Sequence, residues 1–153
     1  MKKVFLIVAV CIVLLFSAKE SFADWRSYVW TYEYVTMPKG MFEIEYYLTE
    51  EQKSLNESKP NTWKHWLELE YGITDHWDIS MYQQFKQSNT KTSDKFEYDG
   101  FKVRTRYRFF EKNKLPLDTL LYLEYIRDDD FKKPNVLEGK LILAKDIGNF
   151  NIS

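Results

Sequence analysis

The chain is poor in cysteine, glycine and proline. Its 153 residues include one cysteine, five glycines and four prolines. The single cysteine, Cys11, lies in an apolar run near the start of the chain. The residues after that run therefore form no disulfide, no thiolate metal site and no thiol nucleophile. Charged residues make up 29% and aromatic residues 18%, which excludes a low-complexity or disordered chain.

A surplus of positive charge is also absent. The formal net charge is −1, and residues 1–23 hold three lysines and one glutamate, which leaves the rest of the chain near −3. Because non-specific nucleic-acid binding needs a strong basic surplus, we expect no nucleic-acid partner.

Catalytic and metal-binding motifs are missing as well. The sequence holds no Gly-x-Ser-x-Gly, no phosphate-binding loop and no zinc-ligand spacing. The two histidines, His65 and His76, lie apart in the sequence, without a motif that pairs either one with a positioned partner for acid–base chemistry. We therefore expect no enzymatic activity, no cofactor and no metal ion.

A long hydrophobic run occurs only at the start. Residues 4–16 are thirteen apolar residues that follow Lys2 and Lys3, and the small side chains of Ser21 and Ala23 fit the positions that a signal peptidase accommodates. A spanning helix needs about 20 residues, so the run is too short to be an anchor. The pattern predicts a secretory signal peptide over residues 1–23 and a mature chain that begins at Asp24.

Apolar and polar residues alternate through most of the remaining chain. Residues 99–109 show this most clearly, with Phe101, Val103, Thr105, Tyr107 and Phe109 between Lys102, Arg104, Arg106 and Arg108. A period of two indicates strands with two unlike faces. Clear strands are predicted over residues 41–49, 63–73, 99–109 and 117–125, and weaker ones over 27–35, 77–85 and 136–145, with an eighth beginning near 149. The predicted fold class is all-β, an antiparallel up-and-down meander of seven strands plus a partial eighth.

Short and long connections alternate between these strands. The short ones are residues 37–40, 74–76, 111–116 and 146–149, and the long polar ones are 50–62, 86–97 and 127–135. This alternation, with strands of roughly ten residues, is typical of bacterial outer-membrane barrels. The short connection at 37–40 conflicts with a periplasmic amino terminus. Either residues 27–35 are not a barrel strand, or the orientation of the remaining strands is reversed.

Two stretches carry a family resemblance. Met37-Pro38-Lys39-Gly40 leads into Phe42-Glu43-Ile44-Glu45, and residues 69–78 read L-E-Y-G-I-T-D-H-W-D. The second stretch resembles the E-Y-G-L-T-D-R-x-D/E turn of porin-like outer-membrane proteins of Gram-negative bacteria, among them the meta-pathway phenol-degradation outer-membrane family. The resemblance runs from Met37 to the carboxyl end.

That resemblance implies an outer-membrane barrel that admits small hydrophobic or aromatic molecules and has no catalytic residues. Its partners would be the lipid bilayer and the barrel-assembly machinery. Chains of that family are longer, and their last strand usually ends on an aromatic residue that the machinery reads, whereas this chain ends at Ser153. We therefore expect an incomplete barrel, the amino-terminal part of a larger one.

Charged residues on the strands are the candidate functional residues. The basic set is Lys102, Arg104, Arg106 and Arg108, and the acidic set on other strands is Glu43, Glu45, Glu68, Glu70, Glu124 and Glu138. They line a water-filled pore, or they pair across strands and fill the interior. Both interpretations need a polar interior. We further expect Arg in place of Val103 to hinder insertion into lipid, and Val in place of Arg104 to be tolerated.

Two functions fit these patterns. The first is a porin-like channel or structural barrel of the outer membrane, with passive passage of small molecules through a charged lumen. The alternative is a soluble periplasmic β-barrel that binds a lipid or hydrophobic ligand. Alternation by itself does not separate them. The basic residues of 102–108 would face the interior of a membrane barrel and the exterior of a soluble one.

Overall fold

The computed structural model describes residues 33–54, 56–148 and 150–153, so the predicted signal peptide lies outside the described residues. The strands are β1 (Phe42–Gln52), β2 (Asn61–Thr74), β3 (Trp77–Asn89), β4 (Asp94–Arg108), β5 (Asp118–Asp128), β6 (Val136–Ile147) and β7 (Phe150–Ile152). No helix in this part of the chain is long and apolar enough to cross a membrane. Each strand pairs antiparallel with the next in the chain. The predicted antiparallel meander is confirmed.

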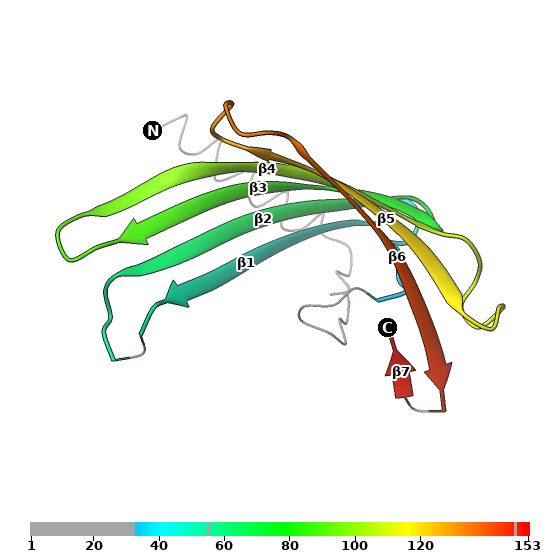
Figure 1. Cartoon of the computed structure of the whole chain (residues 1–153). Coiled ribbons are helices and arrows are strands. Elements are labelled where there is room, and N and C mark those ends of the chain that lie inside the picture. Colours follow the sequence, from blue (N-terminus) through cyan, green and yellow to red (C-terminus); the bar gives the residue numbers. More distant parts are fainter. Residues whose placement is uncertain (1–32, 55, 149) are drawn as a thin grey trace, which may run out of the picture.

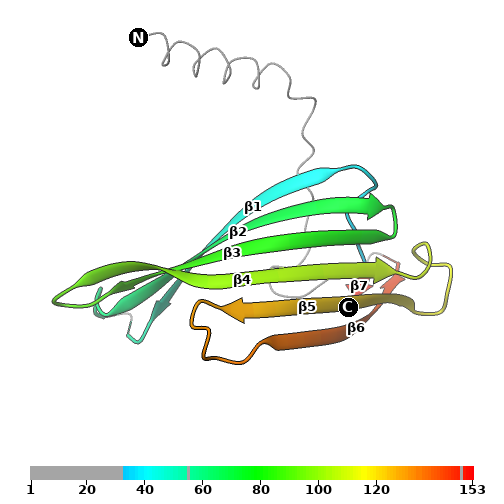
Figure 2. The same ribbon diagram turned by 90° about the horizontal axis from the view of Figure 1, so that it is seen from above.

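The single sheet curls into half of a barrel (Figure 1, Figure 2). We call the end where β1 joins β2, β3 joins β4 and β5 joins β6 the loop end. The opposite end, where β2 joins β3, β4 joins β5 and β6 joins β7, is the turn end. The curl gives the sheet a convex side and a concave side.

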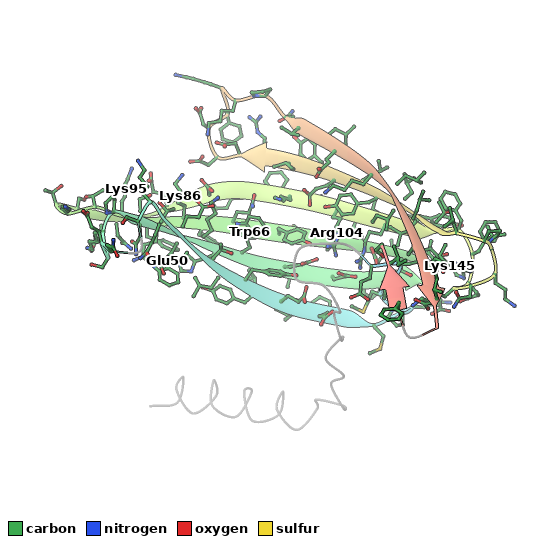
Figure 3. All side chains as sticks on the ribbon, turned by 60° about the horizontal axis from the view of Figure 1, so that its bottom comes forward. Glu50, Trp66, Lys86, Lys95, Arg104 and Lys145 are labelled. Carbon is green, nitrogen blue, oxygen red and sulfur yellow. The ribbon has the colours of Figure 1, made fainter. Side chains whose placement is uncertain are left out.

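The period-two alternation separates these two sides. On β3, Trp77, Ile79 and Met81 are exposed on the convex side, whereas Asp78 and Ser80 are buried on the concave side. Trp66 and Arg104 lie within the hollow of the sheet (Figure 3). Apolar side chains thus point outward and charged ones inward, the reverse of a soluble barrel.

Most of the strand expected over residues 27–35 lies outside the described residues, and the described part, 33–35, is not in strand conformation. Two expectations about the connections are wrong. The loop expected over residues 86–97 is mostly strand, because polar pairs extend the hairpin: the Asn89 amide donates to Asn61 (2.8 Å), and Lys86 pairs with Asp99 (2.8 Å). The connection over residues 109–117 at the turn end is longer than that over 90–93 at the loop end, so short and long connections do not alternate strictly.

A bulge in β4 separates the two halves of the sheet at the loop end. The pairing of β3 with β4 shifts between Gln84 and Phe85, which leaves Asp99 as the extra residue, and Gly100 adopts a φ of +117°. β5 pairs with β4 only from Gly100 to Arg108. The hairpins β1–β2 and β3–β4 therefore project beyond β5 and β6 (Figure 1).

Residues 33–40 precede β1 and lie against the concave side at the turn end; we call them the crossing segment. Tyr34 of this segment forms an apolar cluster with Leu120, Tyr122 and Ala144, and Ile142 packs against it. The cluster explains why apolar residues of β5 and β6 occupy positions on the otherwise charged side of the sheet.

Candidate functional site: the concave face

The charged residues predicted from the sequence lie on the concave side. They are Glu43 and Glu45 of β1, Glu68 and Glu70 of β2, Lys102, Arg104, Arg106 and Arg108 of β4, Glu124 of β5 and Glu138 of β6. Burial is deepest at the centre, where Glu68 and Arg104 are 0% and 1% exposed. The structure brings most of these residues into two groups, and the others lie at the edges of the face.

The first group is centred on Arg104. Its Nη2 lies 2.7 Å from Oε1 of Glu68 and 2.5 Å from Oε2 of Glu70, and its Nη1 donates to the Tyr82 hydroxyl at 2.5 Å. The guanidinium also lies over the Tyr82 ring. Arg104 on β4 thus reaches across β3 to two carboxylates on β2.

Arg106 belongs to the same group. Its Nε and Nη2 donate to the carboxylate of Asp78 at 3.1 Å and 2.7 Å, and Nη2 also donates to Glu70. Glu70 therefore joins the two arginines. Breaking one member of a buried ionic network leaves an uncompensated charge, at a cost of about 3–5 kcal/mol. The expectation that Val would be tolerated at Arg104 does not fit this geometry.

The second group lies beside the first, towards the loop end. Lys102 pairs with Glu124 at 3.3 Å, and its ammonium lies 4.6 Å from the centre of the Trp66 ring. The Tyr122 hydroxyl donates to the same Glu124 carboxylate at 2.8 Å. The ammonium is held between an aromatic face on β2 and a carboxylate on β5.

The remaining predicted residues lie at the edges. At the turn end, Arg108 donates to the Asp75 carbonyl (2.8 Å) and pairs with Glu111 (3.3 Å). On β1, Glu45 accepts a 2.6 Å hydrogen bond from the Tyr47 hydroxyl, which also lies 3.1 Å from Glu68. Glu43 lies opposite Glu70 in the β1–β2 pairing.

Sequence reasoning missed the contacts that the crossing segment makes with the β2–β3 hairpin. The main-chain N–H of Met37 donates to Oδ2 of Asp78 at 3.0 Å, and that of Lys39 donates to Oδ1 of Asp75 at 3.0 Å. The Thr36 hydroxyl donates to the Asp75 carbonyl at 2.8 Å. Asp75 and Asp78 belong to the stretch that carries the family resemblance, and a turn motif by itself does not predict contacts with a segment 36–41 residues away.

Tyr34 anchors the far end of the crossing segment. Its hydroxyl donates to the Phe110 carbonyl at 2.5 Å, and the Arg108 guanidinium lies over its ring. Burial raises the pKa of the Tyr34 hydroxyl. A signal was present in the sequence, because Leu120 and Ile142 are apolar at inward positions of their strands.

The two histidines lie in separate surroundings. His65 contacts the Tyr46 hydroxyl through Nδ1 at 2.6 Å, whereas His76 lies at the turn end, 2.9 Å from Glu111. Within residues 33–54, 56–148 and 150–153, no group of three or more His, Cys, Asp or Glu side chains is arranged to hold a metal ion. The concave face supplies fixed charges and aromatic surfaces.

The chain matches no protein-family model, no curated protein and no solved structure. The family resemblance of the β2–β3 hairpin therefore stays a prediction.

Proposed function

We propose that the protein is an outer-membrane β-barrel protein of porin-like type, with the convex side of the sheet against lipid and the concave side lining the barrel interior. The observation that carries this proposal is the inverted distribution of side chains. The apolar side chains of Ile44 and Leu141 are 60% and 62% exposed, on the side opposite the buried arginines. A contiguous exposed apolar surface is rare on soluble monomers and marks a membrane or partner contact.

Aromatic residues at both ends of the convex side support the same proposal. Near the loop end, the Phe96 ring stacks on Phe85 at 5.7 Å and meets His65 edge-on at 5.5 Å. Near the turn end, the Tyr107 and Phe109 rings meet edge-on at 5.3 Å. From Phe96 to Tyr107, β4 covers roughly 35 Å at ~3.3 Å per residue. Tilted as barrel strands are, this distance corresponds to roughly 25–30 Å of height, the thickness of the apolar band of such barrels.

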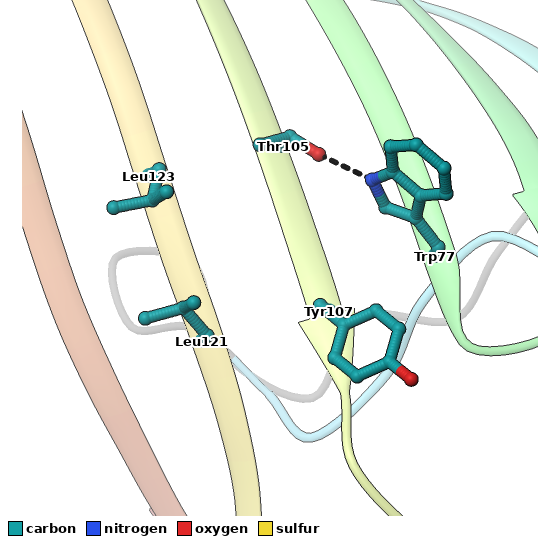
Figure 4. Close-up of a pocket in the computed structure, with 5 residues that line it drawn as sticks. All are labelled: Trp77, Thr105, Tyr107, Leu121 and Leu123. Carbon is teal, nitrogen blue, oxygen red and sulfur yellow. Dashed lines mark hydrogen bonds between the residues drawn. The ribbon is translucent and has the colours of Figure 1, made fainter.

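A shallow groove on the convex side is suited to hydrocarbon. Its volume is about 320 Å³, and it is lined by Trp77, Thr105, Tyr107, Leu121 and Leu123 (Figure 4). The indole N–H of Trp77 donates to the Thr105 hydroxyl at 2.7 Å, so these two polar groups satisfy each other. An amphipathic ring in this position is typical of a membrane interface.

The concave side is the candidate route for small molecules. It carries charges of both signs, as the linings of aqueous pores do. Because Arg104 and Arg106 are paired with neighbouring carboxylates, the interior presents little net charge at that level. We expect passage of small polar molecules with weak charge selectivity.

Adjacent residues of β6 give a matched test of membrane exposure. Leu141 lies on the convex side and Lys140 on the concave side. In a Cys11→Ser background, spin labels at Leu141→Cys and Lys140→Cys in reconstituted vesicles should differ. The label at residue 141 should be relaxed mainly by dissolved oxygen, which concentrates in lipid. The label at residue 140 should be relaxed mainly by a water-soluble reagent. Equal access of the water-soluble reagent to both positions would contradict membrane insertion and favour the soluble periplasmic barrel.

Passage itself needs a separate measurement. Vesicles that contain the protein should swell faster in solutions of small sugars or amino acids than protein-free vesicles do. If the vesicles swell at the protein-free rate while the β6 labels still show lipid contact, the channel function is refuted. The protein would then be a structural barrel protein.

A further inference from the structure

The crossing segment spans the concave side from β1 to β6. Pro38 lies against Gly72 of β2, and Met37 is bonded to Asp78 of β3. Tyr34 packs against Leu120 of β5 and Ala144 of β6. In Figure 2 this segment leaves β1 at the turn end. One short stretch of chain therefore lies across the width of the sheet.

Gly72 fits the segment so closely that no other residue is accommodated. A Cβ at this position would lie 2.0 Å from the carbonyl oxygen of Pro38 and 2.6 Å from that of Met37. The main chain is also bonded there, because Gly40 donates to the Gly72 carbonyl at 2.8 Å and Gly72 donates to the Met41 carbonyl at 3.0 Å. Gly72 serves close main-chain approach, which is a use that only glycine permits.

The carboxylates of the same hairpin hold the segment by its main chain. Asp75 accepts from the N–H of Lys39 and Asp78 from the N–H of Met37. Carboxylate acceptors form stronger hydrogen bonds to N–H groups than neutral acceptors do. Gly72, Asp75 and Asp78 therefore form one binding surface for the crossing segment.

Three side chains of the crossing segment are deeply buried, whereas Val35 and residues 38–40 are exposed. Tyr34, Thr36 and Met37 are 2%, 4% and 8% exposed. Towards the loop end of the same face, Lys64 and Lys86 are only half-buried. The contacts of the crossing segment with Gly72, Asp75 and Asp78 all lie at the turn end.

We propose that the crossing segment is a built-in plug that closes the turn end of the barrel interior, and that Gly72, Asp75 and Asp78 are its docking site. The plug's effect on passage rests on the function proposed above, whereas the docking site rests on geometry alone. While the plug is bound, solutes that enter from the loop end are blocked at the turn end. Release of the plug opens a path through the interior.

The test uses the full chain in a Cys11→Ser background with Met37→Cys as a reporter. Met37→Cys keeps the main-chain N–H that binds Asp78. Gly72→Ala should expel the segment. Gly139→Ala is the matched control, because a Cβ there meets only the Leu123 side chain, at an ordinary 3.5 Å.

In detergent, maleimide labelling of residue 37 should become severalfold faster with Gly72→Ala and stay unchanged with Gly139→Ala. In planar bilayers, Gly72→Ala should raise single-channel conductance severalfold and Gly139→Ala should not.

Each outcome decides one part. Unchanged labelling with Gly72→Ala would overturn the docking site. Faster labelling with unchanged conductance would overturn the plug. A chain that never enters bilayers would overturn the proposed function and the plug's effect on passage, while labelling still decides docking. Tyr34→Ala is a second variant for the case that Gly72→Ala folds poorly. It alters the crossing segment and leaves Gly72, Asp75 and Asp78 intact, so it should also give faster labelling and higher conductance.

Discussion

The main-chain N–H of Met37 and the guanidinium of Arg106 bind the same carboxylate, that of Asp78, at 3.0 Å and 2.7 Å. One buried carboxylate thus joins the chain that precedes the sheet to the central strand of the charged face. The crossing segment and the ionic network are parts of one structure.

We expect Val103→Arg to hinder folding into bilayers. Val103 lies on the convex side between Met81 of β3 and Tyr125 of β5, near the middle of the apolar band. An arginine on the lipid face near the midplane costs about 2–4 kcal/mol. Folding into vesicles, followed by the heat-modifiable shift on gels, measures the effect. Phe131→Arg is the control, because this loop residue is 83% exposed. Equal folding of the two variants would show that Val103 does not meet lipid.

Arg104→Met should destabilise the folded protein strongly. The substitution leaves Glu68 and Glu70 buried with one partner fewer, and removing one member of a buried pair costs about 3–5 kcal/mol. Urea unfolding of the detergent-folded or vesicle-folded protein gives the free energy. Lys86→Met is the control, since the Lys86–Asp99 pair is about one-third exposed and such pairs contribute at most about 1 kcal/mol. A loss of stability no larger than that of Lys86→Met would refute the network's importance.

Gly100→Ala should disrupt the junction of β4 with β5. A Cβ at Gly100 would lie 2.1 Å from the Arg127 carbonyl oxygen, and the φ of +117° suits only glycine. Gly40→Ala shares a positive φ but has open space around its Cβ, so it should cost only about 1 kcal/mol. We expect the unfolding free energy to fall by more for Gly100→Ala. The reverse order would show that close approach at this bulge is unimportant.

Tyr34→Phe and Tyr34→Ala should separate the hydroxyl from the ring. Loss of the hydrogen bond to Phe110 costs about 1 kcal/mol, whereas loss of the buried ring costs about 3–5 kcal/mol. Hydrogen exchange at the main-chain amides of Met37 and Lys39, which donate to Asp78 and Asp75, should be slightly faster with Tyr34→Phe and much faster with Tyr34→Ala. Unchanged exchange in both variants would mean that Tyr34 does not anchor the segment.

The strands and their faces could be predicted from the sequence, because alternation is a local property. The run from Phe101 to Arg108 placed β4 and assigned each side chain to one side of the sheet. The crossing segment could not be predicted in this way. Residues 33–35 continue an alternating stretch, and their contacts with Phe110 and Leu120 are distant in sequence.

The pairing of individual charges was also beyond the sequence. Arg104 reaches Glu70 only because Ser80 lies between them in the register of β2, β3 and β4, and small side chains at such positions leave room for a long one. The sequence predicts a loop over residues 86–97, because the strand conformation of this polar hairpin depends on cross-strand pairs such as Asn61 with Asn89. The pairing of the strands decides both the charge contacts and the length of this hairpin, and strand register is not a local property of the sequence.

The arrangement of the charged pairs constrains the order of assembly. Glu68 and Asp78 precede their arginine partners along the chain, by one or two strands. A chain that entered the bilayer strand by strand would bring carboxylates into an apolar medium before any cation neutralised them, at a cost of several kcal/mol for each. The smallest unit that carries its own counter-charges is β2, β3 and β4 together. If the protein is the outer-membrane barrel proposed above, we therefore expect these three strands to fold against one another before they enter the membrane, and to enter it in a single step.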